Sequence, residues 1–107
     1  MVKRAIKHAY QKLTRGFSDR ETWGLYYEIA KFTLPRLKRF KEVTICYPID
    51  PRTPDPESWE KILDTMIFAF EWIILDETAD AEDTPEARAL VKQGFQYFGE
   101  FFQDLWW

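Results

Sequence analysis

The sequence predicts an all-α protein, a compact bundle of four main helices within a single domain that covers residues 1–107. Apolar residues recur every three or four positions in four separate segments, which is the helical period. Helix start signals precede three of these segments, at Ser18, Asp55 and Thr84. The one stretch with β propensity, residues 43–47, has no partner strand.

The first helix is expected from Val2 to Thr14, with a basic face opposite an apolar one. Gly16 falls just past its end, where a left-handed cap favours glycine. Phe17 follows and can pack over the first turn of the next helix. The connection between the first two helices is therefore expected to be tight. The apolar face comprises Ile6, Ala9, Tyr10 and Leu13.

The second helix, expected from Ser18 to Lys41, is the element around which the rest is organised. Ser18 and Glu21 have the spacing of a capping box. The segment is apolar on more than one side, which is typical of a helix buried between neighbours. Pro35 removes an amide donor, yet the apolar period continues beyond it, so we expect a kink there. The alternative is a break into two helices near Thr33.

A long, proline-rich loop is expected over residues 42–56, between the second and third helices. Its prolines forbid regular structure, and loops of this length are functional or lie over the core. Ile45, Tyr47 and Ile49 alternate, which favours wrapping over the core. Cys46 lies in this strip and is expected to be a buried, inert thiol.

The third helix is expected to begin after Asp55, with proline at its first position and an acid in its first turn. An acidic, solvated loop over residues 76–84 separates it from the fourth helix. The apolar face of the third helix comprises Trp59, Ile62, Leu63, Met66, Ile67, Phe70, Ile73 and Ile74.

The fourth helix is expected to begin at the Thr84-Pro85 signal. Gly94 and Gly99 lower its intrinsic stability, and we expect them to allow close approach of another helix. The terminal Trp106 and Trp107 are expected to dock on the domain or on a partner. The apolar face comprises Ala87, Leu90, Val91, Gly94, Phe98, Phe101, Phe102 and Leu105.

Charge is divided unevenly along the chain, although the net charge is only −3. Residues 1–52 hold 12 Lys and Arg against 5 Asp and Glu, a net charge of +7. Residues 53–107 hold 3 against 13, a net charge of −10. This pattern suits a polyanion-binding half. The alternative is that the two halves pair with each other, within one fold or across a dimer.

Neither a membrane span nor a secretory signal is expected, because no apolar run has the necessary length. The lone cysteine excludes an internal disulfide and a multi-cysteine zinc site, which fits a cytoplasmic protein. We find no catalytic constellation with specific spacing, and so expect a protein that is not an enzyme and needs no cofactor or metal. His8 is expected to be an exposed polar residue rather than a base.

A binding function is the class that remains. Aromatic faces combined with basic side chains hold nucleotides without reading their sequence. The second helix carries both kinds of residue, so we predict a site for a small phosphate-bearing nucleotide there. The alternative is that the aromatics are core and the cations are solvated. The candidate ligand-binding residues are Trp23, Tyr26, Tyr27, Lys31, Arg36, Lys38 and Arg39.

Two blocks of the sequence resemble an uncharacterised family of small proteins encoded by tailed bacteriophages. The first block spans Arg15 to Lys41 and includes Trp23-Gly24-Leu25-Tyr26-Tyr27 and Leu34-Pro35-Arg36-Leu37-Lys38-Arg39. The second reads Trp59-Glu60-Lys61-Ile62-Leu63 and continues to Glu71. The resemblance covers a little over half of the chain. It gives a setting and no mechanism.

That resemblance implies a small accessory protein that acts by binding in the host cytoplasm. One hypothesis is an anti-defence protein that sequesters a nucleotide signal. In one version of this hypothesis the protein is a homo-oligomer and the nucleotide binds across the interface between its copies. The alternative is an inhibitor or adaptor that binds a host protein through the acidic C-terminal half and the Trp106-Trp107 end. A structural component of the virion is a third possibility.

Overall fold

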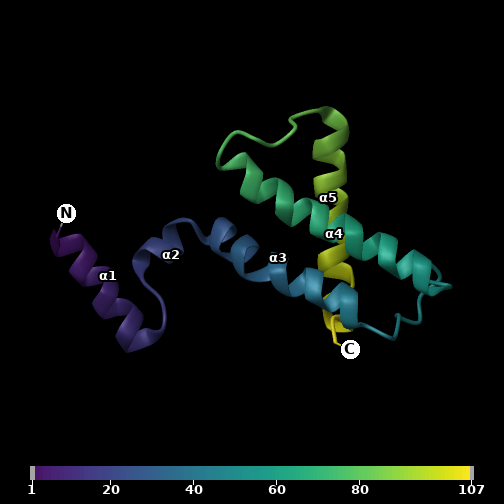
Figure 1. Cartoon of the computed structure of the whole chain (residues 1–107), viewed down its shortest axis with the longest axis horizontal. Coiled ribbons are helices and arrows are strands. Elements are labelled where there is room, and N and C mark those ends of the chain that lie inside the picture. Colours follow the sequence, from purple (N-terminus) through teal and green to yellow (C-terminus); the bar gives the residue numbers. More distant parts are fainter. Residues whose placement is uncertain (1, 107) are drawn as a thin grey trace.

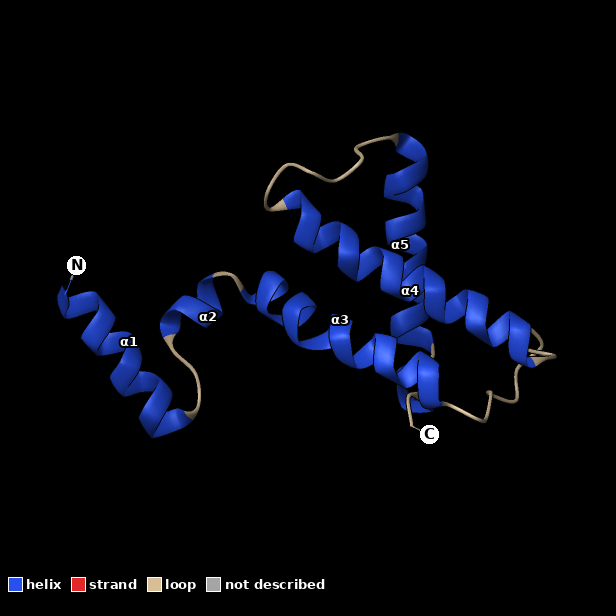
Figure 2. Ribbon diagram, in the orientation of Figure 1, coloured by secondary structure: helices blue, strands red, loops and turns tan. Residues whose placement is uncertain are grey.

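The computed structural model describes residues 2–106, and its regular elements are all helical (Figure 2). The all-α prediction is therefore confirmed, and no strand occurs within these residues. The elements are α1 (Val2–Arg15), α2 (Asp19–Trp23), α3 (Leu25–Val43), α4 (Pro56–Asp76), α5 (Pro85–Glu100) and the short 3-10 helix η1 (Phe102–Asp104).

The predicted central helix is two helices, divided at Gly24. The backbone of Gly24 has φ −104° and ψ 42°, outside the helical region. Glycine costs about 1 kcal/mol in a helix interior relative to alanine, so the chain bends there most easily. Helix α3 then continues through Pro35, so the alternative break near Thr33 is not found. The kink at Pro35 remains a prediction.

Helices α3, α4 and α5 form the packed body of the protein. Helix α4 contacts both α3 and α5 (Figure 1), and it supplies most of the buried hydrophobic side chains. The predicted apolar face of α4 is thus confirmed as the centre of the core. Its buried members pack with residues from α3 and from the end of α5. The core cluster comprises Ala30, Leu37, Trp59, Ile62, Leu63, Met66, Phe70 and Phe101.

Both predicted helix starts in the body are confirmed by their caps. The Asp55 carboxylate accepts a hydrogen bond from the Ser58 amide at 2.8 Å at the start of α4. The Thr84 hydroxyl accepts one from the Ala87 amide at 3.0 Å at the start of α5. Each cap satisfies an amide that has no partner within its helix. The two starts are therefore fixed by local chemistry.

Helix α1 stands apart from this body, so the compact four-helix bundle is not confirmed. Within the described residues α1 packs against α2 alone, and the molecule is elongated, with extents of 55 × 33 × 20 Å (Figure 1). The face predicted to be core is instead exposed: Ile6 by 63%, Tyr10 by 68% and Leu13 by 87%. Helix α2 is too short to cover it, since it has only five residues.

The long loop over residues 44–55 has no regular structure, as predicted, but it does not wrap over the core. Ile45 is 85% exposed and Ile49 fully so, and Cys46 is also exposed. The predictions of an apolar wrapping strip and of a buried thiol are wrong. The loop instead folds on itself, because the buried Thr53 hydroxyl donates to the Pro48 carbonyl at 2.7 Å.

The end of the described chain is also more exposed than predicted. Trp106 is 69% exposed rather than docked on the body, and Trp107 lies outside the described residues. Among residues 2–106 we find no helix with the length and apolar character that a membrane span requires.

Candidate functional site

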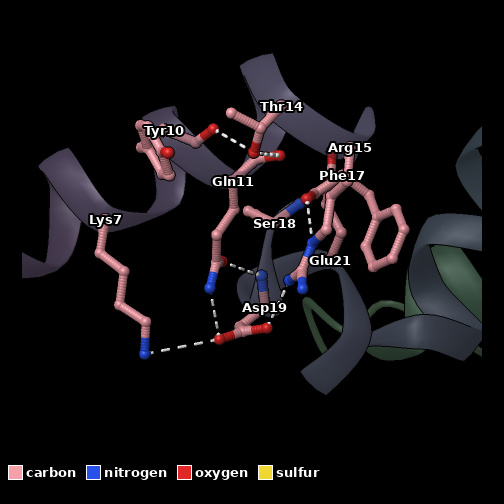
Figure 3. Close-up of polar contacts among 9 residues, drawn as sticks. All are labelled: Lys7, Tyr10, Gln11, Thr14, Arg15, Phe17, Ser18, Asp19 and Glu21. Atoms are coloured by element: carbon pink, nitrogen blue, oxygen red, sulfur yellow. Dashed lines mark hydrogen bonds and ion pairs between the residues drawn. The ribbon is translucent and has the colours of Figure 1, made fainter.

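A polar junction, which we call the elbow, joins α1 to α2. Its centre is Asp19, whose carboxylate accepts hydrogen bonds from Gln11 Nε2 at 2.8 Å and from Arg15 at 2.6 Å (Figure 3). The Asp19 amide donates in return to the Gln11 side-chain oxygen at 2.7 Å. Lys7 adds a longer ion pair at 3.6 Å. Side chains from three turns of α1 therefore converge on one residue of α2.

The charged groups of the elbow favour the geometry in which α1 and α2 are joined by these contacts. Hydrogen bonds from Gln11 and Arg15 lower the pKa of Asp19 to about 2. The predicted capping box is present, and Glu21 Oε2 accepts from the Ser18 amide at 2.7 Å. Glu21 also bonds Lys12 at 2.7 Å, and these two contacts lower its pKa, the lysine contact most. The arm formed by α1 is thus held at a defined angle to α2.

A cavity of about 420 Å³ lies within the elbow, between α1, α2 and the start of α3. Two of its cations are already paired, since Lys12 bonds Glu21 at 2.7 Å and Lys31 bonds Glu28 at 2.9 Å. Arg20 has no ion pair among the described residues. The cavity is lined by Ala5, His8, Ala9, Lys12, Ser18, Arg20, Glu21, Glu28 and Lys31.

His8 is buried in this cavity wall, with 7% of its surface exposed, so the prediction of an exposed histidine is wrong. Trp23 of α2 covers it edge-on, with 5.5 Å between ring centroids. The Nδ1 atom of His8 has no hydrogen-bond partner within the described residues. The wall of the elbow cavity therefore contains a buried polar nitrogen whose hydrogen-bonding capacity no described residue satisfies.

Three of the seven predicted ligand-binding residues lie beside the elbow. Trp23 contacts His8, and the guanidinium carbon of Arg4 lies 5.8 Å from the centroid of the Trp23 ring. Lys31 lines the cavity, and its Nζ lies 4.6 Å from the ring centroid of Tyr27. These residues bring two aromatic faces and one cation to the same end of α3.

The other four predicted residues point elsewhere and do not join this group. Tyr26 bonds the Glu77 carboxylate at the end of α4. Arg36 stacks over Phe32 at 3.8 Å and donates to the Phe32 carbonyl at 2.8 Å. Within α3 alone, residues 26–39 extend over about 20 Å of helix at 1.5 Å per residue. One small ligand cannot contact both ends of this set.

Lys38 and Arg39 are engaged by acids. Lys38 pairs with Glu71 of α4 at 2.9 Å, and Arg39 pairs with Glu42 of α3 at 3.0 Å. Lys41 reaches Asp64 of α4 at 2.5 Å. Lys38 and Lys41 of α3 thus pair with acids of α4. Such pairing between the basic and the acidic half is the alternative given above to a polyanion-binding half.

Three apolar surfaces are exposed in addition to the elbow cavity. The arm stripe consists of Ile6, Tyr10 and Leu13 on α1. The α3 strip consists of Leu25, Ile29 and Phe32, each about half exposed or more. The loop surface consists of Ile45, Tyr47, Ile49 and Trp106. The α3 strip continues into a groove of about 270 Å³ lined by Phe32, Thr33, Arg36, Leu37, Phe40, Phe98, Phe102 and Leu105.

Comparisons with protein-family models, with curated proteins and with solved structures find no match for this chain. Among the described residues there is also no group of three potential metal ligands.

Sequence reasoning missed His8, Lys12 and Arg20 as members of a shared cavity. One signal was available: the capping box at Ser18 directly follows the tight connection after α1. A short connection places the last turns of one helix beside the first turn of the next. That argument brings residues 8–12 close to residues 18–21.

Proposed function

We propose that this protein acts by binding another protein, as an inhibitor or adaptor, and performs no catalysis. One observation carries the proposal: the large side chains of Ile45, Tyr47, Ile49 and Trp106 are exposed on the loop surface. Soluble monomers rarely expose apolar side chains in contiguous groups, and such groups mark interaction sites.

The loop surface is the part that best suits a different protein as partner. A cavity of about 50 Å³ is lined by Tyr47, Pro48 and Trp106, so the loop and the C-terminal end adjoin. Arg52 ties the loop to the end of α5 through Glu100 and stacks over Phe101 at 4.6 Å. The apolar side chains are thus displayed on an anchored support, and interfaces rely on aromatic anchors held in this way.

The resemblance to small bacteriophage proteins suggests what the partner is. A phage accessory protein acts in the host cytoplasm, so a host defence protein is the partner we propose. Asp104 lies beside Trp106 in the same cavity wall, which brings part of the acidic C-terminal half into this surface. A partner with an apolar pocket and a basic rim fits these groups.

The experiment compares capture of host proteins by the unmodified protein and by the double variant Ile45→Ser/Ile49→Ser. Both side chains project from the body, so the variant should melt at the unchanged temperature. We expect recovery of the partner to fall by about tenfold or more, as for loss of central anchors. The matched control is Ile6→Ser/Leu13→Ser on α1. Equal recovery by the loop variant would refute the proposed surface.

A nucleotide site in the elbow cavity is a second candidate function. The favouring observation is that Arg20, free of ion pairs among residues 2–106, shares the cavity with Lys31 and His8. Trp23 packs edge-on against His8 and offers an aromatic face next to the cavity wall. We therefore propose that a phosphate-bearing nucleotide signal would bind here, through Trp23, Tyr27 and Lys31, and not along the whole of α3.

This second candidate is tested by thermal shift and titration with ATP and with a cyclic dinucleotide, at low and high salt. Binding to the folded state raises the melting temperature. We expect a salt-sensitive rise that Arg20→Ala abolishes. Arg39→Ala is the control, because Arg39 lies at the far end of α3 and pairs with Glu42. A flat response of folded protein to both nucleotides would exclude the elbow site for this ligand class.

A further inference from the structure

The arm stripe and the α3 strip have the same spacing. Ile6, Tyr10 and Leu13 are separated by steps of four and three residues. Leu25, Ile29 and Phe32 repeat these steps on α3. Each row covers about 10.5 Å of helix axis at 1.5 Å per residue. Rows with alternating steps of three and four interlock when two helices pack side by side.

The α1 helix of a given chain does not cover its own α3 strip. The elbow fixes α1 through Asp19, and the side of α1 that faces the elbow is the one with Ala5, His8 and Lys12. The arm stripe occupies a different side of the helix and is exposed. Figure 1 shows α1 at one end of the molecule, joined to the body through α2. Within residues 2–106 nothing covers either row.

The charges of the two parts are complementary. Residues 1–15 contain five Lys and Arg and no acid, a net charge of +5. Residues 16–107 contain 10 Lys and Arg against 18 acids, a net charge of −8. Glu28 lies on the first turn of α3, and Tyr26 ties that end to Glu77 of the acidic region. Glu28 is already paired with Lys31, so the acid that a basic arm meets at the N-terminal end of α3 is Glu77.

We propose that a second copy of this chain covers the α3 strip with its α1, and that the exchange is reciprocal. A two-fold dimer then buries both rows in both copies, twelve large apolar side chains in all. If each side chain loses on the order of 100 Å² of exposed surface, the dimer removes about 1,200 Å² from solvent. That value reaches the range of stable interfaces. The loop surface is not used, so this dimer leaves the site of the proposed function free.

The first experiment measures the mass in solution by light scattering and sedimentation from about 1 to 100 µM. The unmodified protein should be dimeric. Ile6→Ser/Leu13→Ser should raise the dimer dissociation constant by about 100-fold while the body keeps its melting temperature, because these side chains lie outside the core. Ile45→Ser/Ile49→Ser removes equivalent exposed side chains elsewhere and should stay dimeric. A monomer throughout, or a dimer indifferent to the arm variant, would overturn the exchange.

The second experiment identifies which surfaces meet. In a Cys46→Ser background, a chain with Tyr10→Cys is mixed with a differently tagged chain with Ile29→Cys. These are the central residues of the two rows, so they approach each other in either helix direction. We expect a disulfide that joins one chain of each kind. Cross-links only between two Tyr10→Cys chains would show that the arms pair with each other, and would refute the proposal.

These tests separate this inference from the proposed function. Loss of host-protein capture in the loop variant, with an intact dimer that the arm variant dissociates, supports both. Loss of the dimer in the arm variant with unchanged capture also supports both, since the two surfaces act independently. A monomeric protein that still captures its partner refutes the exchange alone. An arm-exchanged dimer with capture indifferent to the loop variant refutes the proposed partner surface alone.

Discussion

Gly94 of α5 lies directly against the Thr65 carbonyl of α4. A Cβ atom at Gly94 would stand 2.4 Å from the Thr65 oxygen and 2.6 Å from Ala69 Cβ, closer than such atoms approach. The close approach predicted for Gly94 is therefore confirmed. Gly99, expected to act in the same way, faces open space within 4 Å. Two glycines five residues apart thus have different roles.

Gly94→Ala should destabilise the protein by about 1–3 kcal/mol, the cost of an overpacked core. The methyl group would meet backbone, which cannot rotate away as a side chain can. Gly99→Ala is the matched control and should stabilise by up to about 1 kcal/mol, because alanine favours helix. Urea unfolding of both variants checks this. Similar effects from the two substitutions would show that α4 and α5 do not pack as described.

The features predictable from sequence are those fixed within a few residues. The caps at Asp55 and Thr84 each need one side chain and an amide three residues on, so both helix starts were placed correctly. The arm stripe shows the limit of this reasoning. Periodicity identifies an apolar face but not what covers it, so Ile6 and Leu13 were expected in the core of a bundle that the chain does not form.

The elbow should open in acid because of Asp19. Its pKa falls from 3.8 to about 2 in the folded state, owing to hydrogen bonds from Gln11 and Arg15. A lowered carboxyl pKa means that the stabilisation is complete above pH about 4 and is lost as the pH falls towards 2. NMR resonances and order parameters of α1 should report this release. In Asp19→Asn the arm should already be loosened at pH 6 and should show little further change.

Asp83→Asn is the control for the acid titration. Asp83 also carries a paired carboxylate, with Arg88, but it lies in the α4–α5 loop, distant in sequence from the elbow. This variant should keep the acid-induced release of α1. If it abolished the release while Asp19→Asn preserved it, the arm would be held by something other than the elbow network.

The candidate site was only partly predictable, for a physical reason. Trp23 and Lys31 were identified because aromatic and basic residues occur together in one predicted helical segment. His8 was not, since its burial depends on Trp23 reaching over from another helix. Lys38 was assigned to a ligand, yet it meets Glu71 33 residues later in the chain. Residue types indicate what a side chain can bind, and only the packing of helices decides which partner is present.

Leu63 and Leu13 offer a test that separates core from interface. Leu63 has no exposed surface, whereas Leu13 is 87% exposed. Leu63→Ala should lower the free energy of unfolding by about 2–5 kcal/mol at every protein concentration, because it leaves a cavity. Leu13→Ala should change the stability of the isolated chain by no more than about 0.5 kcal/mol.

The two variants should differ most clearly in how concentration affects melting. Association stabilises the folded state by mass action, so the melting temperature of the arm-exchanged dimer rises with protein concentration. Leu63→Ala should keep this dependence at a lower temperature, since it leaves the arm stripe unchanged. Leu13→Ala should flatten it. A steep dependence that survives in Leu13→Ala would mean that α1 contributes nothing to assembly, and that the arm stripe faces water in the functional protein.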